Sequence, residues 1–430
     1  MTAAAPTRIR VRSYNVGFGD CFLLSLFYAT GDVRHVLIDF GSTMASRNGP
    51  ETLLPVAEKI REHTGGKLHM VVATHRHADH ISGFGKEPGA VIKSLEPERV
   101  LQPWTEDPEL QPDATGPVDV RGDAPGNRAL AARLSDMHAV AAGVLEQVPR
   151  LEESGLVTKT IANQLRFLGE TNLKNEAAVK NLMTMGRKPP IYARFGTRLA
   201  LARLLPGIQI DVLGPPTLRQ SGAIAKQASS NADEFWQLAA RRAVPVSAGN
   251  GRIFPRAAVA RRPPQEARWL IPQIAQMRAQ EMLSIVRILD GVLNNTSLIL
   301  LFHIGKRLLL FPGDAQIENW SYALFAAPDH EAIRARLAKA DFYKVGHHGS
   351  RNATPKTLWN TFEHRAPAPA PGRLATMVST LAGKHPGTPG KNTEVPRLAL
   401  IEELNRMSDL RNTQTLRSKS EFWTDVELDA

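Results

Sequence analysis

Three histidines and one aspartate lie within six consecutive positions, 75 to 80, of this 430-residue chain. His75, His77, Asp79 and His80 come directly after a short apolar run, so they begin the loop that leaves a predicted strand. Alternate residues of an extended segment point to one side, which lets His75 and His77 bind a single ion. Imidazole and carboxylate both bind zinc at roughly 2.0–2.2 Å. Asp79 and His80 lie past the turn and can serve a second ion, so the spacing predicts a dinuclear metal site.

A two-metal site needs further ligands from distant parts of the chain. Asp314, the pair His347 and His348, and His385 each follow an apolar strand pattern. Because ligands of α/β proteins bind at the carboxyl ends of the strands, we expect these side chains to converge with His75. Adjacent residues of an extended backbone face opposite ways, so we expect only one histidine of the pair to bind metal. The other would contact a phosphoryl oxygen or protonate the leaving group.

The elements that must position these residues follow an alternating strand and helix pattern. Periodicity and turn residues predict strands before and after the histidine cluster, at 9–16, 21–29, 34–41, 68–74, 208–216, 296–311 (a hairpin), 341–345 and 375–380. Helical periodicity covers 51–63, with Gly65 as the expected residue just past the helix end. Two segments, 103–207 and 217–289, lack this alternation. We therefore expect an α/β core interrupted by insertions.

The expected domain organisation divides the chain into six parts. We predict a core whose halves are separated by two insertions and one strand, followed by a C-terminal segment. The parts are core 1–102, a mostly helical insertion 103–207, a core strand 208–216, a basic and partly helical insertion 217–289, core 290–395, and a C-terminal helix with a polar tail 396–430.

Several blocks of the sequence resemble one protein family. "THRHADH" is similar to the HxHxDH signature of the metallo-β-lactamase superfamily. Other blocks resemble more narrowly the metallo-β-lactamase domain at the C-terminus of ComEC competence proteins. In chain order they are "NVGFGDCFLL", "VLIDFGS", "NNTSLILLF", "LLLFPGDA", "YKVGHHGSRNAT" and "MVSTLAGKHPGTP". The resemblance covers about 8–102, 208–216 and 290–395, and leaves both insertions unaccounted for.

The resemblance implies an αββα metallo-β-lactamase sandwich with α-helical insertions and two Zn²⁺ ions, with Mn²⁺ as the alternative. Asp314 would bridge the ions, His75 and His77 would hold one, and Asp79, His80 and one of His347 and His348 would hold the other. Asp79, Asp314 and His347 would take part in catalysis. Ser350, His385, Arg241 and Arg242 are expected to contact the substrate. Unlike most metallo-β-lactamases, this chain has no evident histidine ligand between the first motif and Asp314, a feature that it shares with ComEC-like members.

Charge and composition narrow the class of protein. The net charge is +11, and the stretch from Gly186 to Arg262 alone carries thirteen Lys or Arg against three acidic residues. Such a local excess favours contact with nucleic acid or another polyanion, although a solvated insertion would show it too. Cys21 is the only cysteine, which excludes a disulfide framework. The first residues lack a signal-peptide core and no run of 18 apolar residues occurs, so we expect a soluble cytoplasmic protein without a membrane partner.

Three functions fit these observations. The first is a metal-dependent phosphodiesterase that uses a dinuclear, metal-activated hydroxide, most simply a nuclease that acts on DNA rather than RNA. The second is hydrolysis of a small phosphoester, ester or lactone, which would require a closed apolar pocket. The third is a partner-dependent subunit, in which the helical insertions dock another protein and the hydrolase activity is latent.

Overall fold

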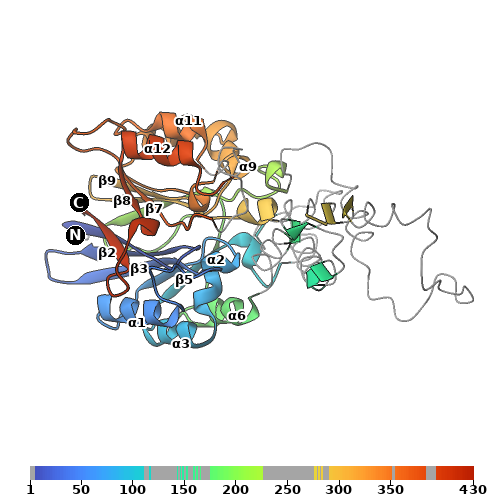
Figure 1. The fold of residues 1–430 in the computed structure, drawn as a ribbon. Helices are drawn as coiled ribbons and strands as arrows, with labels where there is room; N and C mark the ends of the chain where they lie inside the picture. The colour runs from blue at the N-terminus through green and yellow to red at the C-terminus, as the bar shows by residue number, and fades with distance from the viewer. Residues whose placement is uncertain are drawn as a thin grey trace, which may run out of the picture.

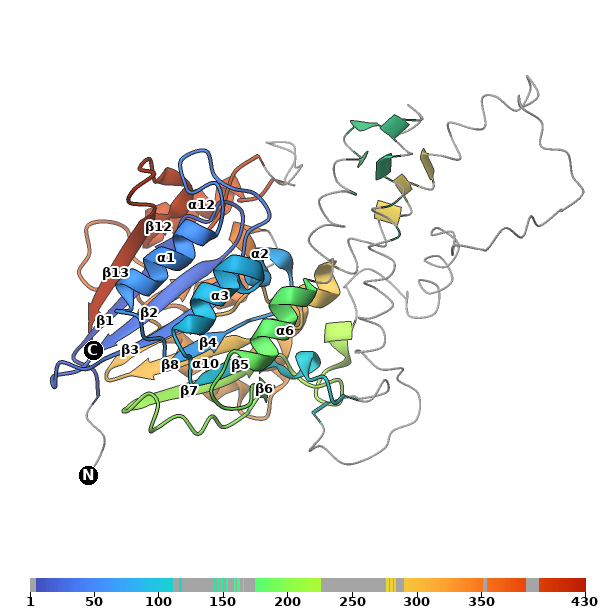
Figure 2. The ribbon, with the colours of Figure 1, turned by 90° about the horizontal axis from the view of Figure 1, so that it is seen from below.

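Two β-sheets pack face to face, and helices cover the outer face of each sheet (Figures 1 and 2). The computed structural model describes residues 5–110, 116–117, 175–225, 290–350, 354–383 and 394–430, with scattered positions inside 143–165 and 276–283. The fold is therefore mixed α/β, in four layers of helix, sheet, sheet and helix. Within these described residues, no helix combines the length and the apolar character that crossing a bilayer would require.

The first sheet has seven strands, and its outer face carries three helices. The antiparallel part comprises four strands, after which the remaining three add on in parallel. In spatial order the strands are β13 (Trp423–Asp429), β1 (Arg8–Tyr14), β2 (Cys21–Phe27), β3 (Val33–Phe40), β4 (Met70–Val72), β5 (Arg99–Pro103) and β6 (Ile191–Ala193). The covering helices are α1 (Leu54–His63), α3 (Lys86–Ser94) and α6 (Glu176–Thr184).

The second sheet has six strands and a helical layer of its own. Four strands run parallel to one another. The other two add on at one side of them, each antiparallel to the strand before it. The order is β12 (Asp409–Asn412), β11 (Ala375–Val378), β10 (Phe342–Lys344), β9 (Arg307–Phe311), β8 (Ile299–Ile304) and β7 (Ile208–Gly214). Its helices are α9 (Ile317–Ser321), the π-helical turn η5 (Tyr322–Ala326), α10 (His330–Ala338), α11 (Lys356–Thr361) and α12 (Leu398–Met407).

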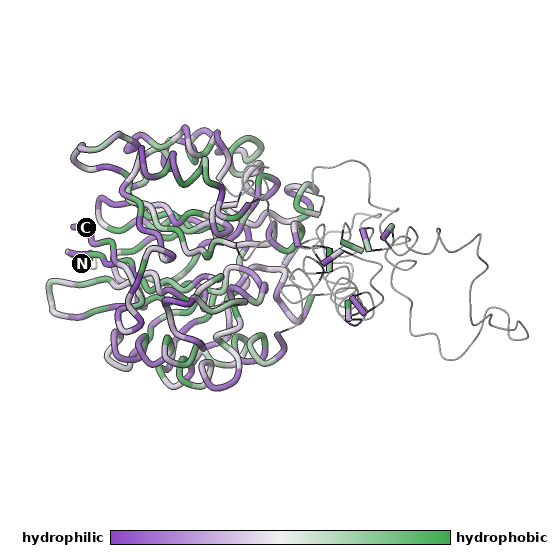
Figure 3. Tube along the Cα trace, in the orientation of Figure 1, coloured by the Kyte–Doolittle hydropathy of each residue, from purple (hydrophilic) through white to green (hydrophobic). Residues whose placement is uncertain are grey.

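Alternation along the strands places the main hydrophobic core between the sheets. On β1, Ile9 and Val11 face the inner core, where they meet aromatic residues of the second sheet such as Phe311. The intervening residues of the central strands face the helices, and Leu37 of β3 packs in the same cluster as Ile60 of α1. Apolar residues recur along the strands and helices on both sides of the sandwich (Figure 3). This two-sided burial requires strands that are apolar on both faces.

Two of the expected domain boundaries are wrong. The range 103–207, predicted as an insertion, contains α6 and β6, both of which belong to the first sheet and its helical layer. The range 396–430, predicted to end in a polar tail, contains β12 and β13, which are edge strands of the two sheets. β6 has only three residues, and β13 alternates charged with apolar residues, so neither carries the long apolar run by which buried strands are recognised.

The topology brings the ends of several strands to one edge of the sandwich. β3 and β4 are parallel neighbours, as are β9, β10 and β11, so the loops that follow them leave each sheet on the same side. β2 is antiparallel to β3, and its first residues therefore lie at this edge as well. The loops that carry the predicted ligands begin here. α2 (Ala78–Ile81), one turn long, starts at the same edge.

Candidate metal centre

The loop after β4 delivers the first group of predicted ligands. The chain leaves β4 at Val72, bends at His75, and then forms the single turn α2, which carries Asp79 and His80. All four predicted ligands of this loop are buried. A close approach of backbone holds the turn: a Cβ atom at Gly41 would lie 2.5 Å from the backbone nitrogen of His80. The glycine at the end of the "VLIDFG" strand is therefore required for α2 to pack against β3.

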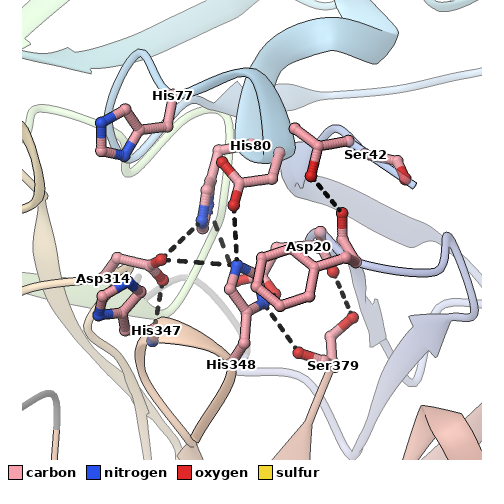
Figure 4. A network of polar contacts seen from close by, with 12 residues as sticks. Asp20, Ser42, His77, His80, Asp314, His347, His348 and Ser379 are labelled. Carbon is pink, nitrogen blue, oxygen red and sulfur yellow. Dashed lines mark hydrogen bonds and ion pairs between the residues drawn. The ribbon is translucent and has the colours of Figure 1, made fainter. Parts of the chain in front are cut away.

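Five predicted ligands converge into two overlapping groups. The candidate ligand atoms of His75, His80 and Asp314 lie within 4.8 Å of one another, and so do those of Asp79, His80 and His348. Asp314 Oδ2 is 3.0 Å from His80 Nε2 and 3.7 Å from His348 Nε2. Asp79 Oδ2 is 3.1 Å from His348 Nε2 (Figure 4). His80 belongs to both groups, and Asp314 Oδ2 of the first group faces His348 of the second. We call these five residues the metal cluster.

Neighbouring groups orient the imidazoles of the metal cluster. Asp39 accepts hydrogen bonds from the backbone N–H and the hydroxyl of Thr74, and its Oδ2 lies 2.8 Å from His80 Nδ1. The Nδ1–H of His348 donates to the Ser379 carbonyl at 2.9 Å. Each contact leaves the Nε2 atom facing the cluster, which is how protein environments usually prepare histidine ligands for a metal.

The donor atoms of the cluster fit a metal ion. Within the described residues, Asp79 Oδ1 is buried and lacks a hydrogen-bond partner, while His80 Nε2 and Asp314 Oδ2 face each other at 3.0 Å. Unsatisfied buried polar atoms are rare in proteins and call for an explanation. A set of imidazoles and carboxylates is suited to Zn²⁺, and Mn²⁺ accepts the same oxygen donors. The residues present therefore fit the group that the sequence predicts.

In the metal-free protein the charges of the cluster are distributed unevenly. Burial and the neighbouring imidazoles of His80 and His77 hold the pKa of His75 well below its usual value. Burial also disfavours the charged form of His80, but Asp314, Asp39 and Asp20 outweigh it and raise the pKa of His80 well above the usual value. Imidazolium at His80 thus supplies part of the positive charge that the surrounding carboxylates require.

A buried lysine that the sequence did not single out completes the charge balance. Lys344, on β10, is 2 % exposed in its side chain, and its Nζ lies 3.2 Å from Asp314 Oδ1. The same ammonium contacts the Asp20 carboxylate and donates to the carbonyl of Gly313 at 2.9 Å. Burial lowers the pKa of Lys344, but the carboxylates of Asp20 and Asp314 raise it by a larger amount. The net pKa therefore lies above the usual value, and the side chain stays charged. The available signal was the single charge inside the apolar run "FYKV".

The two histidines of the pair lie in different surroundings. Only His348 belongs to the metal cluster. The His347 imidazole accepts or donates a hydrogen bond with Ser350 Oγ at 2.8 Å, while its backbone N–H donates to Asp314 Oδ1 at 2.9 Å. We expected an extended backbone here, which is wrong. Both histidines have positive φ, 44° and 52°, in a tight turn that separates their side chains.

His77 lies beside the metal cluster without joining either group of ligand atoms. Its Nδ1 is 3.0 Å from His75 Nε2, and its Nε2 is 3.9 Å from Asp290 Oδ1. In Figure 4 the ring of His77 lies apart from His80 and Asp314. Of the residues expected to contact substrate, only Ser350 is described. His385, Arg241 and Arg242 lie outside the described residues, as does the part of the basic stretch from 226 to 262.

Comparison with known proteins adds no name to this site. No family model matches the chain, and no curated protein matches it significantly. The metal cluster therefore has to be interpreted from its own geometry and from the motifs in the sequence.

Proposed function

We propose that this protein is a metal-dependent phosphodiesterase with a metallo-β-lactamase-type sandwich, and that its substrate is a nucleic acid, DNA in preference to RNA. The observation that carries the proposal is the metal cluster, in which Asp314 Oδ2 contacts His80 Nε2 and approaches His348 Nε2 at the edge shared by both sheets. The four-layer arrangement and the sequence motifs are consistent with that family. The net charge of +11, concentrated in one segment, supports a polyanionic substrate.

Each residue of the site has a role that follows from its contacts. His75 and Asp314 would hold one ion, and Asp79 and His348 would hold the other. His80, whose Nε2 offers one lone pair, would serve one of the two ions. Two bound cations would supply an activated water and positive charge for the phosphoryl oxygens. Within the part of the chain that the structure describes, Asp79 Oδ1 has no hydrogen-bond partner, so this atom is placed to orient a water. The partly exposed His347, held by Ser350, is placed to donate a hydrogen bond to a substrate oxygen.

The test compares nucleic-acid cleavage with and without metal. Purified full-length protein is treated with a chelator, reloaded with Zn²⁺ or Mn²⁺, and incubated with labelled single- and double-stranded DNA and RNA. We expect metal-dependent cleavage of DNA that Asp79→Ala abolishes. Asp329→Ala is the matched control, because Asp329 is an exposed carboxylate at the start of α10 and belongs to neither group of ligand atoms.

The other outcomes discriminate between the remaining functions. Hydrolysis of bis-nitrophenyl phosphate without cleavage of any polynucleotide would contradict the nuclease proposal and favour a small-molecule hydrolase. Hydrolysis of neither substrate, together with a protein that co-purifies in stoichiometric amount, would favour the partner-dependent subunit.

A further inference from the structure

A second polar cavity lies on the outer face of the first sheet, at the opposite end of the strands from the metal cluster. The strand register aligns Arg10 of β1 with Ser25 of β2, and Ser25 with His35 of β3. His69, directly before β4, lies beside His35, and the two residues exchange hydrogen bonds. His35 precedes Asp39 by four residues, which is ~13 Å along a strand. The cavity is therefore separate from the metal cluster.

The cavity has a polar floor and mixed walls. Its volume is about 440 Å³, and Arg10, Ser25, His35 and His69 form a row across the floor. The end of α1, which lies over these strands in Figure 2, and the residues after it form one wall. The remaining lining residues are Arg12, Leu23, Phe27, Val33, His63, Thr64, Gly65 and Lys67. No carboxylate is among them.

Hydrogen bonding fixes the protonation of His69. Its Nδ1 accepts the backbone N–H of His35 at 3.0 Å, so in the neutral ring the proton must be on Nε2. Burial, with Arg34 and Lys67 nearby, lowers the pKa of His69 to about 4, so the ring is neutral at neutral pH. The residue is 4 % exposed, and its Nε2 has no hydrogen-bond partner within the described part of the chain. His69 therefore presents a buried N–H donor that lacks an acceptor.

The other polar groups of the cavity are donors as well. Ser25 Oγ lies 2.9 Å from His35 Nδ1, and whichever atom donates, the pair keeps one further O–H or N–H group. Arg12 forms a fork with Asp425 of β13, and Arg10 is held by Glu427 in the same strand. A guanidinium has five N–H donors and one carboxylate occupies about two, so donors remain available on both arginines. Lys67 adds an exposed ammonium at the mouth.

These donors select an anion rather than a metal ion. A transition metal binds the lone pair of an imidazole nitrogen, but both nitrogens of His69 are committed, Nδ1 as an acceptor and Nε2 as a donor. We propose that this cavity is a second ligand site, which binds the oxyanion group of a small molecule through His69, Lys67 and the Arg10–Ser25 row. Leu23, Phe27 and Val33 leave apolar surface for an organic part of the ligand. The proposal does not depend on the phosphodiesterase activity.

The test uses simple anions as probes on the full-length protein. Binding of inorganic phosphate, phenyl phosphate and benzoate is measured by titration calorimetry at constant ionic strength, with choline as a cationic control. Binding of phenyl phosphate but not of benzoate indicates that the natural ligand carries a phosphate group. Binding of benzoate but not of phenyl phosphate indicates that it carries a carboxylate. Because a charge-assisted hydrogen bond contributes substantially to affinity, Lys67→Met should weaken binding at least about tenfold. Lys93→Met, an exposed lysine on α3, is the matched control and should leave binding unchanged.

Two further measurements separate this cavity from the metal cluster. The anion should shift the Nε2–H resonance of His69 in NMR spectra, and His69→Phe should abolish binding. Loss of binding in Asp79→Ala with retention in Lys67→Met would assign the anion to the metal cluster and overturn the proposal. Absence of binding by all three anions would overturn it too. Because Lys67 is exposed, its replacement tests the site even if His69→Phe fails to fold.

Discussion

Replacement of Lys344 by methionine tests how the charges of the metal cluster are balanced. The Nζ atom lies 3.2 Å from Asp314 Oδ1 and also contacts Asp20. At an effective dielectric constant of about 20, a unit-charge pair at this distance interacts by about 5 kcal/mol. Removal of one partner of a buried ion pair typically costs about 3–5 kcal/mol. We therefore expect the metal-free Lys344→Met protein to lose roughly 5–10 °C in Tm.

The same replacement should strengthen metal binding. Lys344 places a positive charge close to a predicted ligand, where it repels an incoming cation. Lys344 contacts Oδ1 of Asp314, whereas Oδ2 faces the histidines of the cluster. With a metal–oxygen bond of ~2 Å to Oδ2, a divalent ion would lie ~6 Å from Nζ. Even at the dielectric constant of bulk water, this repulsion amounts to about 1.4 kcal/mol. Its removal should therefore raise the affinity for the metal ion about tenfold. The stabilisation by a fixed Zn²⁺ concentration should then rise by a similar amount.

Differential scanning calorimetry of chelated and Zn²⁺-loaded protein measures both effects. The Tm of metal-free Lys344→Met should fall, while the rise in Tm on adding Zn²⁺ should exceed that of the wild type by roughly 3 °C. Lys344→Arg keeps the charge and should show the wild-type response to Zn²⁺. A Zn²⁺-induced rise in Lys344→Met that is equal to or smaller than the wild-type rise would refute the assignment of Asp314 as a ligand beside a balancing cation.

Three other predictions concern catalysis, substrate binding and acid stability. His80→Ala, like Asp79→Ala, should abolish phosphodiester cleavage with an unchanged circular dichroism spectrum, and wild-type turnover in either variant would contradict the mechanism. Neutralising Arg241 and Arg242 should weaken DNA binding and reduce the slope of log affinity against log salt by about 0.9 per lost phosphate contact; an unchanged slope would make the segment a solvated insertion or a docking surface. The pKa of His69 is lowered to about 4 in the folded protein, whereas the same histidine in the unfolded chain has a pKa near 6.5. As the pH decreases from about 6.5 to 4, the unfolded chain therefore binds a proton that the folded protein does not, and the free energy of unfolding decreases. At pH 5 this loss is about 2 kcal/mol, and denaturant titrations of His69→Phe should show a correspondingly weaker pH dependence.

The sequence predicted most of the central elements because their signals are local. β1, β2 and β3 are apolar runs bounded by turn residues, and each lies within two residues of its expected ends. α1 begins three residues after the predicted start and ends at the predicted residue, His63. The predicted strands of the second sheet were also found, because its β8–β9 hairpin and the short strands β10 and β11 are apolar on both faces. A strand or helix that buries apolar side chains has to carry that pattern in its own residues.

The edges of the sheets could not be predicted in this way. β13 is stabilised by its partner β1, through pairs such as Arg12 with Asp425 and Arg10 with Glu427. These pairs join residues more than four hundred positions apart, so no local window contains both. β6 is held by β5 and has three residues of its own. An edge strand of this kind is specified by its neighbour in space, which the linear pattern does not reveal.

The sequence by itself determined which side chains come together at one edge. The spacing of His75, Asp79 and His80, and the strand-end positions of Asp314 and the His347–His348 pair, were sufficient to predict that they meet. Only the tertiary structure decided how they are arranged. It placed His348 and not His347 in the metal cluster, through a left-handed turn, and it brought Asp20, Asp39 and Lys344 around the ligands. Residue type and spacing are properties of the chain, whereas the direction of a side chain and its net electrostatic surroundings depend on contacts between strands distant in the sequence. Those contacts exist only after both sheets have formed.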